Sequence, residues 1–412
     1  MIKKPEILSP AGDPEKLRYA IRYGADAVYM AGKQYGMRAA AGNFEPDQLE
    51  QAVRDCHAAG VKCFVTVNVM PRGHELEDLK QYLERLDAYG VDAVILADLG
   101  LLDLTKKHAP HVKIHISTQT SIVNHEAARM YHSLGADRVV LARELSLEEV
   151  ATIRAKTPKE LEIEVFVHGA MCVSYSGRCL LSNYLTGRDA NHGACAQPCR
   201  WNYHVVEQTR PGQYMPVEED ERGTYIFNSR DMCMIEHIPD LIKTGVDSFK
   251  IEGRAKSFYY TAAVTNAYRR ARDLYLRDPE GFVLPPSIRD EVDKISHRHY
   301  HTGFYYGQPG EYYAESRYIR DYEVCAVVKE CDADGNAILE QRNRFFTGDS
   351  AELLMPGTDA LAFRIPEMQN GAGETITAAP HPMMEVTSAC RYRHPPCPCF
   401  GPKKRNPIIK RG

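Results

Sequence analysis

Gly90-Val91-Asp92-Ala93-Val94-Ile95 is one of four near-copies of a short phrase that decides the fold. The glycine that opens each copy suits the C-terminus of a helix, and the Val/Ile-rich run after the aspartate suits a buried strand. Stretches of helical periodicity come just before the copies, as in Pro14 to Tyr23 and Leu76 to Tyr89. Each copy therefore predicts a helix that ends and a parallel strand that begins. The other copies are Gly24-Ala25-Asp26-Ala27-Val28-Tyr29, Gly135-Ala136-Asp137-Arg138-Val139-Val140 and Gly245-Val246-Asp247-Ser248-Phe249-Lys250.

Further apolar runs bring the predicted strands to eight, alternating with helices up to about Arg254. They are Glu6 to Leu8, Lys62 to Val67, Lys113 to Ser117 and Glu162 to Val167. Eight βα units predict an α/β fold, a closed TIM-type (β/α)8 barrel within residues 1–300. A doubly wound open sheet has the same local pattern, and only the count of eight favours closure.

Polar residues follow the predicted strands, at the ends where both architectures hold their ligands. Each of them can also be a simple cap or turn residue, but the whole ring predicts an active site there. They are Ser9-Pro10-Ala11-Gly12, Asn68, Asp98, Ser117-Thr118-Gln119-Thr120, Arg143-Glu144, His168-Gly169 and Lys250-Ile251-Glu252-Gly253-Arg254.

The rest of the chain divides into an insertion, a second domain and a tail. Residues 169–224 interrupt the barrel pattern with Gly, Asn, Pro and four cysteines, and loops of such length are usually functional or disordered. Short strand-like runs between turns predict a small C-terminal β-barrel domain over residues 301–390. Residues 391–412 are rich in Pro, Lys and Arg, so we expect a flexible basic tail.

Composition limits the classes of function. The chain has 412 residues and a net charge of -4, so an RNA partner would have to meet a local basic patch. The N-terminus lacks the pattern of a secretory signal, and no apolar run approaches the roughly 20 residues that cross a bilayer. We therefore expect a cytoplasmic protein with no membrane partner. In that compartment its 12 cysteines are more useful for metal binding or catalysis than for disulfides.

Four cysteines of the insertion have the spacing of a metal site, Cys172-x6-Cys179-x15-Cys195-x3-Cys199. Thiolates are ligands of both iron–sulfur clusters and tetrahedral zinc, and the nearby glycines let a loop turn its ligands inward. Zinc sites more often use a tight pair at each end, whereas only the second pair is close here. The spacing predicts a metal centre and leaves the metal open. Cys233 is the best reserve ligand.

One stretch resembles the signature of the peptidase U32 (collagenase-like) family. It is Glu164-Val165-Phe166-Val167-His168-Gly169-Ala170-Met171-Cys172-Val173-Ser174-Tyr175-Ser176-Gly177-Arg178-Cys179-Leu180-Leu181-Ser182. Leu8-Ser9-Pro10-Ala11-Gly12, Ser117-Thr118-Gln119 and Lys250-Ile251-Glu252-Gly253-Arg254 resemble the same family, so the likeness spans about residues 5–390. Within the family the chain most resembles the proteins of prephenate-dependent 5-hydroxylation of the tRNA wobble uridine.

The resemblance implies a tRNA substrate, prephenate as co-substrate and a [4Fe–4S] cluster on Cys172, Cys179, Cys195 and Cys199. Some relatives take a fourth ligand further downstream, act on ribosomal RNA or ubiquinone precursors, or work as pairs, which keeps Cys233 and a paralogous subunit in view. Arg38, Lys250 and Arg254 are candidate carboxylate-binding residues, and His168 and Glu252 candidate proton-transfer groups. A plain salt-bridge network of Lys250, Glu252 and Arg254 is the alternative.

The family name also suggests a peptidase, which the residues support poorly. A thiol protease needs a Cys nucleophile beside a His base, and His168 and Cys172 are four residues apart, a useful spacing only on a helix. A His-Glu-x-x-His metalloprotease motif is absent from the sequence. We therefore expect an RNA-modifying hydroxylase-type oxidoreductase, with a peptidase as the alternative.

Overall fold

The computed structural model describes residues 2–37, 42–172, 181–188, 194–198, 218–220, 223–225, 230–307, 318–331, 336–389 and 407–412. Within these ranges, no helix has both the length and the apolar character needed to cross a membrane.

The predicted closed barrel is confirmed. Its eight parallel strands pair in chain order, and β11 bonds both β7 and β1, which closes the ring and excludes the open-sheet alternative. Each predicted strand corresponds to an observed one. The strands are β1 (Glu6–Pro10), β2 (Ala27–Met30), β3 (Lys62–Val67), β4 (Ala93–Leu96), β5 (Lys113–Ile116), β6 (Arg138–Val140), β7 (Glu162–Ala170) and β11 (Ser248–Ile251).

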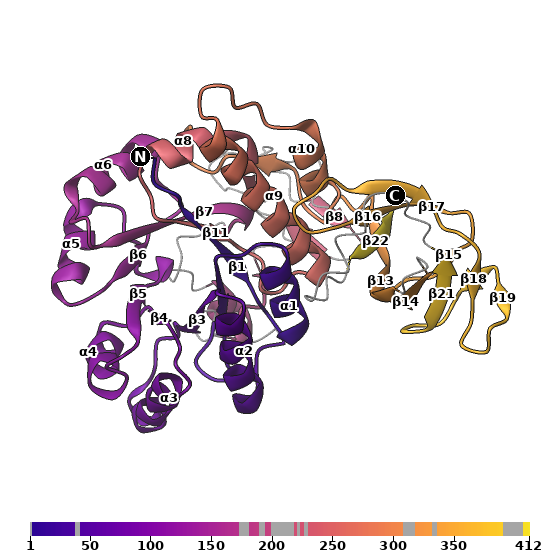
Figure 1. The fold of residues 1–412 in the computed structure, drawn as a ribbon. Coiled ribbons are helices and arrows are strands. Elements are labelled where there is room, and N and C mark those ends of the chain that lie inside the picture. Colours follow the sequence, from indigo (N-terminus) through magenta and orange to yellow (C-terminus); the bar gives the residue numbers. More distant parts are fainter. Residues whose placement is uncertain are drawn as a thin grey trace, which may run out of the picture.

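Helices surround the barrel, as Figure 1 shows. Their buried sides pack on the outward-facing strand residues in one large apolar core. They are α1 (Pro14–Arg22), α2 (Pro46–Ala58), α3 (Leu76–Ala88), α4 (Leu99–His108), α5 (His125–Ser133), α6 (Leu147–Lys156), α8 (Ile238–Lys243) and α9 (Phe258–Arg277), with the short 3-10 turns η1 (Gly73–Glu75), η2 (Thr118–Thr120) and η5 (Ile235–His237).

The aspartate of the repeat explains why the phrase recurs before every second strand. The carboxylate of Asp92 accepts the backbone N–H of Cys63 on β3 at 2.8 Å, and the Asp92 N–H donates to the carbonyl of the same residue. Asp26, Asp137 and Asp247 make the equivalent pair of bonds to the second residue of β1, β5 and β7. These residues are Ile7, Ile114 and Ile163. Each repeat thus fixes an even strand of the ring to the odd strand before it.

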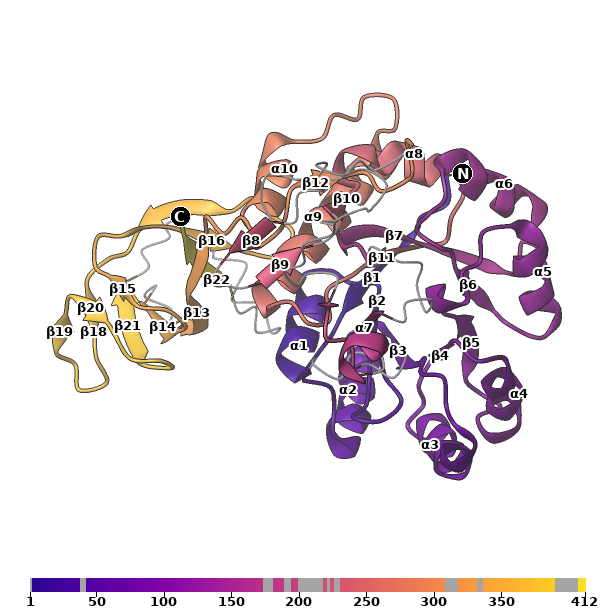
Figure 2. The ribbon, with the colours of Figure 1, turned by 180° about the vertical axis from the view of Figure 1, so that it is seen from behind.

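The insertion starts at the end of β7 and contains α7 (Leu181–Thr186) and the strands β8 (Glu218–Asp220) and β9 (Gly223–Tyr225). In Figure 2, α7 is seen in front of the barrel strands. The chain then returns through β10 (Asp231–Cys233), which pairs antiparallel with β7 and parallel with β12 (Tyr300–His301). Helix α10 (Pro286–Asp293) packs against α9. The insertion therefore leaves and rejoins the barrel at the same end of the β7–β10 pair, where Ala170 lies opposite Asp231.

The second domain is an antiparallel sheet, at the right in Figure 1 beside α9 and α10. Its own apolar core is separate from that of the barrel. The strands run in the order β17 (Leu361–Arg364), β16 (Ser350–Leu354), β22 (Ile408–Arg411), β13 (Glu323–Cys331), β14 (Asn336–Gln341), β21 (Glu385–Ala389), β18 (Met368–Gln369) and β19 (Thr375–Ile376), with β15 (Phe345–Phe346) and β20 (Ala378–Ala379) as a separate pair.

The boundaries of this domain differ from those expected. Tyr305, beyond the predicted boundary at residue 301, still packs in the barrel core, and the sheet begins only at Glu323. The expected flexible tail is wrong for its last residues, because β22 lies between β13 and β16. Apolar Ile408 and Ile409 are buried there. Lys410, one of the basic residues that suggested a tail, is also buried and forms an ion pair with Glu291. Residues 390–406 lie outside the described ranges.

Buried charges connect the second domain to the barrel. Lys410 is completely buried, and its Nζ lies 2.6 Å from a carboxylate oxygen of Glu291 on α10 and 3.3 Å from one of Glu352 on β16. Lys294 also contacts Glu352 at 2.8 Å. Because unpaired buried charges are costly, these ion pairs require the C-terminal strand to dock against α10.

Candidate active site at the barrel mouth

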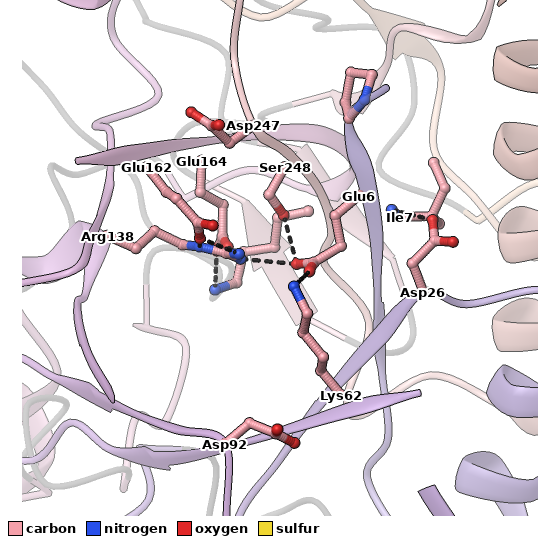
Figure 3. A network of polar contacts seen from close by, with 12 residues as sticks. Glu6, Ile7, Asp26, Lys62, Asp92, Arg138, Glu162, Glu164, Asp247 and Ser248 are labelled. Atoms are coloured by element: carbon pink, nitrogen blue, oxygen red, sulfur yellow. Dashed lines mark hydrogen bonds and ion pairs between the residues drawn. The ribbon is translucent and has the colours of Figure 1, made fainter. Parts of the chain in front are cut away.

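The barrel interior contains a chain of paired charges, buried except for the partly exposed Glu162, which we call the barrel network: Glu6, Arg138, Glu162, Glu164 and Lys250. Arg138 bonds Glu6 and Glu164, each at 2.8 Å, and Glu162 at 2.6 Å, as Figure 3 shows. Glu164 is fully buried and also accepts from Lys250 at 2.7 Å. The network runs from the amino end of the barrel towards its mouth, so it replaces an apolar filling with paired charges.

The network places Lys250, one of the predicted carboxylate-binding residues, against the carboxylate of Glu164. Burial tends to raise the pKa of Glu164, but the positive charges of Lys250 and Arg138 outweigh it and lower that pKa below its ordinary value. Glu164 is therefore an anion that matches the Lys250 cation. The Lys250 Nζ also lies 4.7 Å from the centre of the Tyr29 ring. Lys250 thus faces the barrel interior as part of an ion network, and its carboxylate partner is Glu164, a residue outside the Lys250–Glu252–Arg254 network weighed from the sequence.

His115 lies beside this network and stays neutral. It is buried, and its ring packs edge-on against Phe64 at 4.6 Å between ring centres. Burial and the nearby charges of Arg138 and Lys250 hold its pKa well below the usual value. A neutral imidazole adds no further positive charge to the interior.

Arg143, which follows β6, joins three strand ends at the mouth. Its Nη1 donates to the carbonyl of Ala170 on β7 at 2.9 Å, and its Nη2 lies 3.7 Å from a carboxylate oxygen of Glu252. The guanidinium covers the ring of Phe166 at 3.9 Å. The predicted Glu252 therefore does reach the rim, with its side chain about one-fifth exposed, but its charge faces an arginine that the sequence did not single out as a ligand group.

Arg254 is 3% exposed, and its Nη1 donates to the Thr66 hydroxyl at 3.4 Å. Its carbonyl lies where a side chain at Gly12 would be: a Cβ there would be 2.0 Å from the oxygen. The Leu8–Gly12 segment therefore needs glycine so that the loops after β1 and β11 can touch. Arg38, the third predicted carboxylate-binding residue, lies outside the described ranges.

His168, predicted as a proton-transfer group, points away from the barrel interior. Its ring lies among Tyr260, Tyr268 and Tyr300, with ring centres 5.4 to 5.8 Å apart, and only 1% of the residue is exposed. Burial is the main cause that holds its pKa well below the usual value. A neutral, enclosed imidazole suits a structural role, in which His168 packs β7 against α9. The catalytic role of His168 stays a prediction.

Two of the four predicted metal ligands are described. Cys172 and Cys195 are both exposed, whereas Cys179 and Cys199 lie outside the described ranges. The sulfur of Cys195 accepts the backbone N–H of Gln197 at 3.4 Å, and Gln197 takes the left-handed φ of 56°. The buried Ser182 hydroxyl accepts the N–H of Ala196 and donates to the carbonyl of Arg188, so it holds α7 against the Cys195 segment. A turn that aims an amide at a cysteine sulfur is typical of thiolate ligands.

The reserve ligand Cys233 has a different environment. It is buried on β10 opposite His168, and burial raises the pKa of its thiol to about 11. Within the described residues, no three His, Cys, Asp or Glu side chains gather in a way that could hold a metal ion. Whether Cys233 replaces one of the four predicted ligands stays a prediction.

Gln119 is a second rim residue that sequence reasoning did not assign. It is 5% exposed, in η2 directly after β5, and its Nε2 has no hydrogen-bond partner in the part of the chain that the structure describes. The same holds for the buried Nε of Arg143. Both residues stood in the ring of polar strand ends, and that position was the only signal for them.

Comparisons with known proteins match both parts of this architecture. The model described as "Peptidase family U32" matches residues 12–315, and "Peptidase family U32 C-terminal domain" matches residues 320–397. The chain is 39% identical to "tRNA hydroxylation protein P1" of Bacillus subtilis (strain 168), over 93% of this chain and 91% of that protein. It is 37% identical to "tRNA hydroxylation protein P" of Escherichia coli (strain K12), over 92% of each chain.

A third relative acts on a different RNA according to its name. It is "23S rRNA 5-hydroxycytidine C2501 synthase" of Escherichia coli (strain K12), 37% identical over 71% of this chain and 44% of that protein. With the barrel, its insertion and the C-terminal sheet all accounted for, the chain belongs to peptidase family U32.

Proposed function

We propose that this protein is an RNA-modifying hydroxylase that takes part in forming 5-hydroxyuridine at the wobble position of tRNA, with prephenate as co-substrate. The observation that carries the proposal is coverage. Two relatives named for tRNA hydroxylation match more than nine-tenths of this chain, so the likeness includes the barrel, the cysteine-bearing insertion and the C-terminal sheet. The product carries a hydroxyl group on C5 of uracil, where the unmodified base carries a hydrogen.

The charge of the mouth supports an anionic ligand. Arg143 and Arg254 lie at the strand ends, Arg143 beside the carboxylate of Glu252 and Arg254 beside the Thr66 hydroxyl, whereas Lys250 is paired with Glu164 in the interior. Guanidinium groups bind carboxylate and phosphate oxygens well because they offer several donors in one plane. The carboxylates of prephenate and the phosphates of tRNA both suit such a rim.

We further propose that Cys172, Cys179, Cys195 and Cys199 hold a [4Fe–4S] cluster. The amide that points at the Cys195 sulfur and the exposure of Cys172 and Cys195 fit this group, and all-thiolate donors are its usual ligands. Such a cluster supplies one-electron transfer. The polypeptide contributes the fixed end of β7: Gly169 lies so close to Glu252 and Tyr260 that a Cβ would be 2.4 Å from the Glu252 carbonyl oxygen, and Cys172 follows three residues later.

A peptidase activity finds little support in the geometry. His168 lies on β7, where residues four apart are spread along the strand rather than stacked on one helical face. Its ring is enclosed by tyrosines, so it cannot act as a base for Cys172 without a rearrangement. The geometry therefore favours the hydroxylase over the thiol protease.

The function is tested by complementing a bacterial strain that lacks its own tRNA hydroxylation protein. Mass spectrometry of tRNA nucleosides should show 5-hydroxyuridine derivatives with the wild-type chain and none with Cys172→Ser. Cys325→Ala, which changes a buried thiol of the C-terminal sheet, is the matched control and should keep the modification. If tRNA still lacks hydroxyuridine when the wild-type chain is expressed, whereas ribosomal hydroxycytidine or quinone levels change, the substrate would be reassigned.

The cofactor is tested separately on protein purified without oxygen. Iron and sulfide in cluster ratio are expected for the wild-type chain and for Cys325→Ala, with a strong loss in Cys195→Ser. Zinc without iron would refute the cluster. A colourless protein that digests gelatin in the presence of a chelator would support the peptidase instead.

A further inference from the structure

Two hydrogen-bond donors at the barrel mouth have no acceptor among the described residues. They are the Nε2 of Gln119 after β5 and the Nε of Arg143 after β6, and both atoms are closed off from solvent. Leaving a buried donor unpaired is costly, so native proteins rarely keep one without a reason. Two such donors on neighbouring strand ends, in the place where this fold binds ligands, indicate a binding site.

Local bonds fix the direction of the Gln119 amide. The Ser117 hydroxyl accepts the backbone N–H of Gln119 and donates to its Oε1, each at 3.4 Å. Because the hydroxyl proton is used on Oε1, the carbonyl side of the amide is held by Ser117 and the Nε2 side is left to donate. In this orientation the Nε2 donors of Gln119 are left to bind a ligand.

The loops that carry the two residues are bonded to each other. The Thr118 hydroxyl donates to the carbonyl of Leu141, and the N–H of Ala142 donates to the carbonyl of Ile122. Each bond involves the immediate neighbour of Gln119 or Arg143, so the two side chains start from adjacent, connected backbone. They can serve one ligand.

Arg143 adds a fixed orientation and a flat surface. Its Nη groups are held by Ala170 and Glu252, and its guanidinium lies 3.9 Å from the Phe166 ring. The bonds hold the guanidinium in place and leave the Nε–H to a ligand. A planar ligand with oxygen acceptors on its edge matches this arrangement, and the pyrimidine ring of an unstacked nucleotide is such a ligand.

We propose that Gln119 and Arg143 hold the reacting pyrimidine by its carbonyl oxygens, and that Gln119 selects uridine over cytidine. The proposal rests on the proposed function, since it names the contacts of the base in that reaction. Uracil has an acceptor, O4, where cytosine has an amino donor. The Nε2 of Gln119 therefore bonds uracil and opposes the cytosine amino group, in a closed site where a hydrogen bond is strong.

The test measures the binding of short single-stranded RNAs that differ only by uridine or cytidine at the target position. The wild-type chain should prefer the uridine RNA by about tenfold, the effect of one discriminating hydrogen bond. Gln119→Ala should lose the preference, and Gln119→Glu, which presents acceptors, should reverse it. Gln81→Glu, an equal change of charge at an exposed position of α3, is the control and should keep the wild-type ratio.

Arg143→Lys separates the second contact from folding. The lysine keeps a positive charge near Ala170 but loses the Nε–H and the plane, so both RNAs should bind about tenfold more weakly with a smaller change in their ratio. An unchanged melting temperature shows that the barrel still folds.

The outcomes separate this proposal from the function on which it rests. If the wild-type chain fails to restore hydroxyuridine in cells, the function fails, whereas the base preference in the binding assay still tests the site. If hydroxyuridine returns but Gln119→Ala keeps the uridine preference, the site assignment is overturned. A variant that changes only the dependence on a carboxylate co-substrate would also overturn it, because the donor pair would then bind a carboxylate.

Discussion

Replacing Glu164 by Gln removes the one negative charge that is fully buried in the barrel network. The substitution keeps the shape of the side chain but leaves Lys250, 7% exposed in its side chain, without the carboxylate 2.7 Å away. Breaking a buried ion pair by removing one partner costs about 3–5 kcal/mol. For a domain of this size the loss lowers the melting temperature by roughly 5–15 °C.

The effect depends on pH in a direction that the structure fixes. Lys250 and Arg138 lower the pKa of Glu164 below the ordinary value of 4.5, despite the opposing effect of burial. The carboxylate therefore contributes its full stabilisation above the pKa of the unfolded chain, and the contribution is lost as the pH falls through the lower, folded-state pKa. The difference between wild type and Glu164→Gln should be constant from neutral pH down to about 5 and shrink below about 4.

Thermal unfolding followed by circular dichroism at several pH values measures this difference. Glu162→Gln is the matched control, because Glu162 also bonds Arg138 from the same strand but is 36% exposed, where an ion pair contributes under about 1 kcal/mol. Equal losses for the two variants, or a loss at Glu164 that does not change with pH, would refute the reasoning.

Three further predictions concern the fold. Asp137→Ala leaves the backbone N–H of Ile114 without its acceptor and should destabilise the protein by about 1–3 kcal/mol in urea unfolding, with a similar effect for Asp92→Ala at Cys63; no loss at either site would contradict the strand-fixing role of the repeat. Lys410→Met leaves Glu291 buried without its partner and should cost about 3–5 kcal/mol, much of which the double variant with Glu291→Leu should recover; a double variant as unstable as the single one would argue against the pair. Gly169 has a φ of 111°, and the Cβ that Gly169→Ala adds would lie 2.4 Å from the Glu252 carbonyl oxygen, so this variant should lower both the iron content and the melting temperature of the purified protein. Gly60→Ala, whose Cβ would meet open space, is the control and should change only the stability.

The barrel could be predicted because its repeat carries local signals. Gly90, Asp92 and the apolar run after them mark a helix end and a strand start within a few residues, and the same signals return three times. The structure adds the reason for the aspartate, which binds the backbone of the preceding strand. That bond joins segments 29 residues apart, so no local pattern could show it.

The site was predicted less completely. Cys172 and Cys195 are exposed on the insertion, and the metal centre that their spacing suggests stays a prediction. Lys250 is matched by Glu164, a residue whose place inside a buried strand gave no hint of an ion pair. The sequence does not rank Gln119 and Arg143 above the other polar residues at the strand ends. Their buried donors, which have no partner among the described residues, are visible only in the structure. The tail was misjudged because Lys410 has buried partners from α10 and β16, which a composition of basic residues cannot reveal.

Mapping the modification within a single tRNA is the most direct test of the proposed hydroxylation. A tRNA that normally carries the modified wobble uridine is isolated from the complemented deletion strain, cut into oligonucleotides and weighed by mass spectrometry. The wild-type chain should make the anticodon fragment heavier by the added oxygen, with the change at the wobble uridine and absent with Cys172→Ser. An anticodon fragment of unchanged mass, with the wild-type chain present and its cluster intact, would contradict the assignment.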